Sequence, residues 1–167
     1  RVSMQNPPSI THLLSSAASY VYKRQGSHET AVLFRWWDPN MRLFAEASGK
    51  NALVVTPQAD LDLAAADLVR SAFGHQGQKC SAASLGILVG PVATDERFLR
   101  QVVDAATSLQ VGPATDPATV FGPLVAPAAG KLLDALTVLA PGEEWLLEPR
   151  RLDVDGRVWT PGIKVGV

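Results

Sequence analysis

From residue 26 onward, short apolar runs alternate with longer segments in which apolar residues recur at helical spacing, and this alternation is the feature that most constrains the fold. The strand-like runs are MRLFAEA (41–47), ALVV (52–55), SLGILV (84–89), EWLLEP (144–149) and RVWTP (157–161), and the helix-like segments are 28–37, 61–73, 95–109 and 127–139. Strands that alternate with helices are typical of parallel sheets. The sequence therefore predicts an α/β fold with a parallel sheet, in which the runs 52–55 and 84–89 are buried strands.

Residues that favour helix ends mark the boundaries of these segments. Asp60 can cap the helix 61–73 through its side-chain oxygen, and Thr94 is expected to open the next helix. Pro127 is expected to begin the fourth helix. The stretch 111–123 is rich in Gly and Pro and is expected to be a loop, and DVDG (153–156) is expected to be a turn.

The charge and cysteine content exclude several classes of protein. The 15 Lys and Arg nearly balance the 16 Asp and Glu, which provides no electrostatic reason to expect a nucleic acid or an anionic membrane as partner. No apolar run reaches the roughly 18 residues of a transmembrane helix. The single cysteine cannot form an internal disulfide, which fits a cytoplasmic protein, and no spacing of His, Cys and Asp indicates a metal site.

Residues 1–25 differ from the rest of the chain, because they contain many serines and no acidic residue. A transit peptide or a flexible leader would have this composition. A third interpretation is that VYKRQ, at the end of the segment, is a translated sequencing adapter, which would make the stretch an assembly artefact joined to a truncated gene. We favour this interpretation and exclude the segment from the folded chain. We therefore expect Leu13, Leu14 and Tyr20 not to pack against the sheet.

The only cysteine, Cys80, lies in the stretch FGHQGQKCSA, residues 73–82, between a predicted helix and a predicted strand. Loops at strand ends carry the reactive groups of many α/β proteins, and small neighbouring residues leave room for a substrate. Lys79 could favour the thiolate, although side chains adjacent in sequence often point apart. The alternative is that Cys80 is a small buried hydrophobe, as free cysteines often are.

Glu46 lies within the apolar run LFAEA, where an acidic side chain is expensive to bury without a task or a partner. A thioester on Cys80 would need a base to activate the water that releases it, and Glu46 is a candidate for that base. The alternative is a solvent-facing position on a strand or at a sheet edge. His28 and His75 are expected to be surface or cap residues, and His12 lies in the excluded segment.

Four segments together resemble one family. FGHQGQKCSA resembles the active-site cysteine motif of the aldehyde dehydrogenase superfamily, and LFAEASGKNALVV followed by ADLDLA resembles its glutamate motif. The two candidate residues lie 80 − 46 = 34 positions apart, which is similar to the family's spacing. VGPATDPATVFGPLV resembles the segment after the catalytic-domain helix, and Gly26-Ser27 resembles the end of a cofactor motif. The resemblance covers 26–167 and is closest to glutamate-γ-semialdehyde (1-pyrroline-5-carboxylate) dehydrogenases, as in bacterial bifunctional proline-utilization proteins.

The resemblance implies a partial aldehyde dehydrogenase fold, with the end of a Rossmann-like cofactor domain at 26–56 and a truncated parallel-sheet catalytic domain at 57–167. It implies that Cys80 is the nucleophile and Glu46 the base. It further implies that Gly26 and Ser27 bind NAD and that Ser81 binds the substrate carboxylate. The expected reaction is the NAD-dependent oxidation of L-glutamate γ-semialdehyde to L-glutamate. The parent protein is expected to be a homo-oligomer and could be fused to a proline dehydrogenase domain.

Other parts of the family's site are expected outside this chain, so the fragment is expected to be inactive by itself. Three alternatives stay open. The parent could belong to another subfamily or prefer NADP, or it could be a non-catalytic relative that kept the fold, although the presence of both Cys80 and Glu46 speaks against that. A cysteine hydrolase would need a histidine partner, and neither His28 nor His75 lies in a recognisable triad setting.

Overall fold

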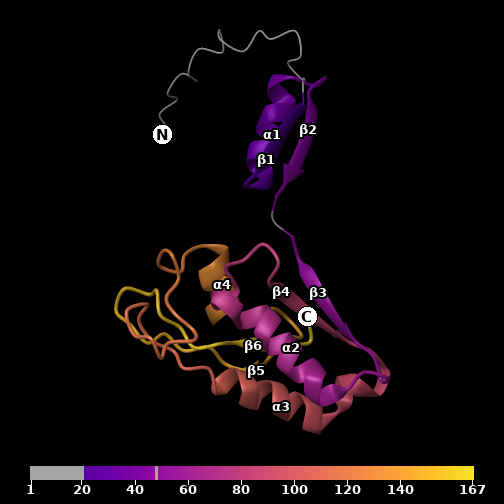
Figure 1. Ribbon diagram of the computed structural model, residues 1–167, viewed down its shortest axis with the longest axis vertical. Helices are drawn as coiled ribbons and strands as arrows, with labels where there is room; N and C mark the ends of the chain where they lie inside the picture. Colours follow the sequence, from indigo (N-terminus) through magenta and orange to yellow (C-terminus); the bar gives the residue numbers. More distant parts are fainter. Residues whose placement is uncertain (1–20, 48) are drawn as a thin grey trace. The chain divides into compact units, whose positions relative to one another are not determined.

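The computed structural model describes residues 21–47 and 49–167, and it divides the chain into two compact units (Figure 1). The first unit ends at Gly49, and the second unit runs from Lys50 to Val167. The strand formed by Asn51–Val55 pairs with a strand of the second unit. The expected division into a cofactor domain ending at Thr56 and a catalytic domain at 57–167 stays a prediction.

The first unit contains a strand, a helix and a second strand, namely β1 (Val21–Gln25), α1 (His28–Trp37) and β2 (Arg42–Glu46). The two strands pair in parallel, with Gln25 opposite Glu46 at one end. The bounds of α1 are those predicted from the sequence. Ser27 is its N-cap residue, and its hydroxyl oxygen accepts a hydrogen bond from the Thr30 N–H at 3.4 Å.

Strand β1 lies inside the segment that the sequence analysis excluded from the folded chain. Val21–Gln25 pair along their whole length with β2, so the described fold begins five residues before the expected boundary at Gly26. Backbone pairing depends on the neighbouring strand rather than on the composition of the segment, which is why composition did not indicate it. The adapter origin of the segment stays a prediction, and Leu13, Leu14 and Tyr20 lie outside the described residues.

The second unit contains two pairs of strands and three α-helices among its described residues (Figure 1). In chain order the elements are β3 (Asn51–Val55), α2 (Leu61–Phe73), the 3₁₀ turn η2 (Gly74–Gly77), β4 (Ala83–Leu88), the 3₁₀ turn η3 (Gly90–Thr94), α3 (Glu96–Thr107), α4 (Lys131–Thr137), β5 (Glu144–Leu147) and β6 (Ile163–Val165). Strands β3 and β4 pair in parallel, and β5 and β6 pair antiparallel. The expected α/β architecture with parallel pairing is confirmed, whereas β6 and its antiparallel partnership were not predicted.

The helix ends show which local signals were correct. Asp60 caps α2 as predicted, because its carboxylate accepts hydrogen bonds from two backbone N–H groups of the first turn, both at 3.1 Å. The cap of α3 is Asp95 rather than Thr94, which closes η3 instead. Helix α4 is shorter than the predicted 127–139, since it starts after Gly130, whose φ of 52° is incompatible with a right-handed helix.

Two expectations about strands were wrong. The stretch 157–161 forms only an isolated bridge between Arg151 and Trp159, because the N–H groups of Arg157 and Val158 donate to the Asp153 carboxylate and hold a turn. The runs 52–55 and 84–89 are strands, but they are not buried throughout. In β3, Val55 is buried while Val54 is exposed, so one face of the strand packs on the core and the other does not.

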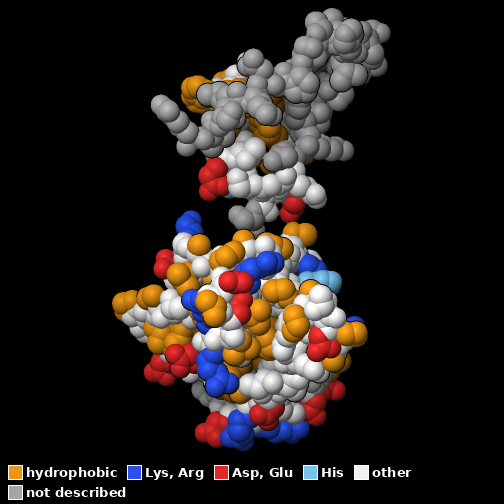
Figure 2. All heavy atoms as spheres, turned by 90° about the vertical axis from the view of Figure 1, so that its left-hand side faces the viewer, with side chains coloured by type: hydrophobic (Ala, Val, Ile, Leu, Met, Phe, Trp, Pro, Cys, Tyr) orange, Lys and Arg blue, Asp and Glu red, His pale blue; other side chains and the backbone are white. Residues whose placement is uncertain are grey.

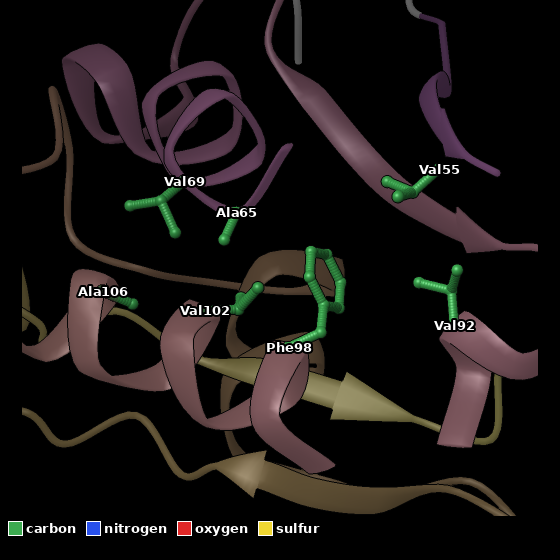
Figure 3. Packing of buried hydrophobic residues seen from close by; sticks show 7 residues of the cluster. All are labelled: Val55, Ala65, Val69, Val92, Phe98, Val102 and Ala106. Atoms are coloured by element: carbon green, nitrogen blue, oxygen red, sulfur yellow. The ribbon is translucent and has the colours of Figure 1, made fainter. Parts of the chain in front are cut away.

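The core of the second unit consists of seven buried residues (Figure 3), namely Val55, Ala65, Val69, Val92, Phe98, Val102 and Ala106. Figure 3 shows the buried residues of α3 on the side that faces α2, with the Phe98 ring pointing away from its own helix. The residues of α2 and α3 in this cluster recur four positions apart, which is the spacing of one helix face.

Replacing Phe98 by alanine is expected to lower the free energy of unfolding of the second unit by about 3–5 kcal/mol, because its side chain is 1% exposed and its removal leaves a cavity. Urea denaturation followed by circular dichroism measures this change. Phe44→Ala is the matched control, since Phe44 is 64% exposed and should change stability by less than about 0.5 kcal/mol. Equal losses in the two variants would contradict the assigned core.

A half-buried ion pair links β6 to the turn before β5. The Lys164 ammonium lies 2.8 Å from the Glu143 carboxylate and 4.9 Å from the centre of the Trp145 ring. The Ala140 N–H donates to the same carboxylate at 2.8 Å. The hydrogen bond from Lys164, followed by that from Ala140, holds the pKa of Glu143 below its ordinary value of 4.5.

This lowered pKa predicts a dependence of stability on pH. The unfolded chain takes up the Glu143 proton near pH 4.5, before the folded chain does, so stability is lost as the pH falls from there through the folded pKa. Glu143→Gln should remove this part of the acid dependence, measured as urea midpoints at about pH 7 and about pH 3. Glu144→Gln, at an exposed neighbouring residue, is the control. An unchanged acid dependence in Glu143→Gln would show that the pair does not form.

Candidate active site

Cys80 lies at the tip of a tight turn between η2 and β4. The Ala82 N–H donates to the Lys79 carbonyl oxygen at 3.1 Å, which closes the turn around Cys80 and Ser81. Both of these residues are exposed, and the thiol is free. A buried, space-filling role for Cys80 is therefore wrong for this structure, and both site residues predicted in this loop occupy one turn.

The chain reaches this turn through an unusual backbone conformation. His75 and Gln76 have positive φ values of 53° and 59°, and Gly77 follows with 68°. A side chain at Gly77 would place a Cβ 3.1 Å from the Ala72 carbonyl oxygen, so both the φ value and the close approach require glycine there. Left-handed geometry at a residue with a side chain costs about 1–3 kcal/mol and persists only where the surroundings hold it.

Two glutamines of this loop hold it against residues 122–125. The Val125 N–H donates to Gln78 Oε1 at 2.9 Å. The Gln76 side-chain amide has one orientation in which both its nitrogen and its oxygen form hydrogen bonds. In that orientation the nitrogen donates to the His75 carbonyl oxygen and the oxygen accepts from the Gly122 N–H. The loop rich in Gly and Pro thus supports the cysteine loop from one side.

Asn51, the first residue of β3, holds the turn from the other side. Its side-chain Nδ2 donates to the carbonyl oxygen of Cys80 at 2.5 Å and to that of Ala82 at 3.2 Å. The cysteine turn is therefore tied to the strand that precedes α2, about thirty residues earlier in the chain.

The other three candidate residues meet in the first unit. The Gly26 N–H donates to the Glu46 carbonyl oxygen at 3.0 Å, directly beyond the last pair of the β1–β2 ladder. Ser27 follows as the N-cap of α1. The Glu46 side chain is exposed within the first unit. Its role as the base stays a prediction.

The N-terminus of α1 has the donor set that a dinucleotide would need. The positive end of a helix dipole and the N–H groups of the first turn favour a phosphate group, and α1 starts directly after the carboxyl end of β1. Glu29 in the same turn opposes this with a negative charge. That Gly26 and Ser27 hold the pyrophosphate of NAD stays a prediction.

Glu46 belongs to the first unit and Cys80 to the second. We expect the two side chains to face a common cleft, about 6–8 Å apart, so that one water can bridge Glu46 to a carbonyl bound to Cys80. This expectation stays a prediction. The same holds for the approach of bound NAD to the thiol.

A cavity of about 310 Å³ in the second unit is separate from the candidate residues. It is lined by Thr107, Leu109, Val111, Leu147, Glu148, Arg150, Thr160 and Pro161. Cys80 and Ser81 do not line it. The candidate nucleophile is presented on an exposed turn and not in this cavity.

Three further properties of the described residues concern metal ligands, membrane-spanning helices and surface charge. No three His, Cys, Asp or Glu side chains within residues 21–47 and 49–167 gather as metal ligands would. The helices that the structure describes are too short or too polar to cross a bilayer. Figure 2 shows basic and acidic side chains interspersed on the viewed face of the second unit, without a field of one sign.

Comparison with known proteins identifies the family. The family model described as "Aldehyde dehydrogenase family" matches residues 25–167. The chain belongs to the aldehyde dehydrogenase family. A 1-pyrroline-5-carboxylate dehydrogenase of Geobacillus thermodenitrificans is 46% identical over 84 residues, which cover 50% of this chain and 16% of that protein. The resemblance inferred from the four sequence segments is thereby confirmed.

Solved aldehyde dehydrogenase structures confirm the fold. Proline Utilization A from Corynebacterium freiburgense aligns with 89% of this chain at a TM-score of 0.80 and 49% identity, and the aligned part is 15% of that chain. A 1-pyrroline-5-carboxylate dehydrogenase from Thermus, solved with bound NAD, aligns with 86% of this chain at a TM-score of 0.71 and 32% identity, over 29% of its own length. The present chain therefore spans between about a seventh and a third of these relatives' lengths.

Asn51, Gln76 and Gln78 are the residues near the cysteine that sequence reasoning missed. Each lies in a stretch that carried the family resemblance, so the signal was an amide side chain beside a motif residue. The sequence could not indicate that Asn51 and Gln78 bond to segments about thirty and forty-seven positions away. Such partners are set by the fold.

Proposed function

We propose that the parent protein oxidises an aldehyde to a carboxylate through a thioester on Cys80, with NAD as the oxidant. The observation that carries this proposal is the family match across residues 25–167. Within this range the only thiol is exposed, on a turn that Asn51 contacts on one side and that follows the loop held by Gln78. A reactive cysteine needs such access, because the thiolate must reach the substrate carbon.

Each candidate residue has a role in this reaction. The Cys80 thiolate attacks the aldehyde carbon and forms a carbon–sulfur bond, and the Cys80 N–H donates to the resulting oxyanion. Bound NAD supplies the acceptor for the hydride that leaves this carbon, and the loss of hydride makes the thioester. Glu46 then removes a proton from water, whose oxygen attacks the thioester carbon, and the carbon–sulfur bond breaks to release the carboxylate and regenerate the thiolate.

The proposed substrate is L-glutamate γ-semialdehyde, the open form of 1-pyrroline-5-carboxylate, with L-glutamate as product. The name of the Geobacillus relative supports this choice. Ser81, next to the nucleophile on the exposed turn, is proposed to donate its hydroxyl to the α-carboxylate of the substrate. The Proline Utilization A structure supports a parent that also carries a proline dehydrogenase domain. A cytoplasmic homo-oligomer is the proposed form of the parent.

The test is an assay of NADH formation by the purified parent protein. The value of kcat/KM for 1-pyrroline-5-carboxylate should exceed that for betaine aldehyde or malonate semialdehyde by at least about tenfold. Betaine aldehyde has no carboxylate, and the carboxylate of malonate semialdehyde lies closer to the aldehyde carbon than the α-carboxylate of the proposed substrate does. Preference for another aldehyde would assign another subfamily, and parallel assays with NADP determine the cofactor. A parent that binds NAD but oxidises none of these aldehydes would be the non-catalytic relative. The 167-residue chain alone is expected to be inactive.

A further inference from the structure

The backbone on both sides of the Cys80 Cα is held by hydrogen bonds. The peptide group before it is held through the Lys79 carbonyl, which accepts from the Ala82 N–H at 3.1 Å. The peptide group after it is held through the Cys80 carbonyl, which accepts from Asn51 Nδ2 at 2.5 Å. Because a peptide group is planar and rigid, fixing its carbonyl orients the whole group. The two bonds together restrict φ and ψ at Cys80 and thereby the direction of its side chain.

The first of these bonds lies within the turn, whereas the second comes from a different strand. Asn51 uses both N–H groups of its amide, since it also donates to the Ala82 carbonyl oxygen at 3.2 Å. A register shift lies at the same end of the strand pair. Asn51 is opposite Ala83, but Ala52 is opposite Leu85, so β4 contains one extra residue there.

We propose that Asn51 is a positioning residue for the Cys80 nucleophile. This inference rests on the proposed function, and Asn51 acts through Cys80 without contacting the substrate. It holds the Cys80–Ser81 peptide group, while the bond within the turn holds the peptide group that contains the Cys80 N–H, so that the thiol keeps one direction relative to the aldehyde carbon. An exposed turn closed by a single internal bond would otherwise sample several orientations, and small misplacements of a reacting group slow a reaction strongly.

The test compares variants of the full-length parent protein during the first turnover, by rapid mixing with NAD and excess 1-pyrroline-5-carboxylate. Asn51→Asp keeps the shape of the side chain but replaces both donors by an oxygen that repels the two carbonyls. Asn51→Ala removes the side chain. The matched control is Asn40→Asp, because Asn40 is exposed and forms its hydrogen bond to Asp38 through its backbone N–H, which aspartate retains.

The rate constant for the first NADH formed should fall by about 10- to 100-fold in Asn51→Asp and by less in Asn51→Ala, while the amplitude per site and the NAD dissociation constant stay unchanged. Asn40→Asp should match the unaltered protein. A purely structural role would instead lower the amplitude, which counts the folded sites, at an unchanged rate constant. A lowered amplitude at an unchanged rate constant would overturn the inference. An unaltered rate constant at full amplitude would also overturn it, and so would a loss of folding in both Asn51 variants.

The Cys80→Ala variant separates this inference from the proposed function. If Cys80→Ala still forms NADH at the normal rate, the proposed function fails together with the inference that rests on it. If Cys80→Ala is inactive while Asn51→Asp reacts normally, the proposed function stands and only the role of Asn51 is wrong.

Discussion

Cys80→Ala in the parent protein is expected to abolish NADH formation in the first turnover as well as in the steady state. Without the thiol no covalent bond to the aldehyde forms, so the substrate carbon never acquires the negatively charged oxygen that drives hydride departure. Loss of a covalent nucleophile that acts with its partners as a unit lowers the rate by about 10⁴-fold or more. Stopped-flow fluorescence of NADH measures both phases.

The same variant should fold and bind NAD normally. Cys80 is exposed on its turn, and its side chain contributes nothing to the buried core, so the unfolding midpoint should stay within the error of the measurement. Titration with NAD provides the second control. Turnover that survives in a folded, NAD-binding Cys80→Ala protein would contradict the thioester route and return the thiol to a passive role.

Glu46→Gln is expected to separate the two halves of the reaction. Glutamine keeps the shape of the side chain but cannot take a proton from water, so the thioester should form and then persist. The first NADH should appear within about tenfold of the normal rate, whereas the steady-state rate should fall by about 10²- to 10⁴-fold, the usual contribution of a general base. A burst followed by slow turnover is the expected trace, and mass spectrometry should detect the acylated peptide that contains Cys80.

Glu144→Gln is the control for this experiment, because Glu144 is an exposed carboxylate on β5 outside the candidate site. Loss of the burst in Glu46→Gln would mean that Glu46 acts before or during hydride transfer. An experimental structure of the parent protein provides a separate test. Cys80 and Glu46 on opposite faces of the assembled domains would exclude the mechanism, whereas a modestly longer separation in a cofactor-free state is compatible with it.

Much of the local structure followed from the sequence. The bounds of α1 and α2 and the cap at Asp60 all depend on residues within a few positions of each other. The strand predicted at 41–47 lies at 42–46. The apolar spacing of the segment 61–73 predicted the helix α2, which contributes Ala65 and Val69 to the core. The family was also recognisable, because its motifs are short runs of adjacent residues. These features share one cause: their interactions are local, so their pattern is written in contiguous sequence.

The errors concern segments whose backbone had more than one possible partner. RVWTP has the composition of a strand, but the Asp153 carboxylate takes two of its N–H groups, and Ile163–Val165 pair with β5 instead. Val21–Gln25 pair with β2 although their composition suggested a separate leader. Strand propensity describes whether a residue fits a pleated surface, and it does not choose the neighbour.

The candidate site shows the same division. The sequence by itself determined which residue types can perform the chemistry, because the only thiol and an acidic residue stand within recognisable motifs. Only the tertiary structure decided how the thiol is held. The contact from Asn51 requires β3 to lie beside β4 with a register shift. The contact from Gln78 requires residues 122–125 to lie beside the cysteine loop. Contacts between residues that are distant along the chain depend on how whole elements pack, and the free energy of that packing is shared among many residues that no short motif contains.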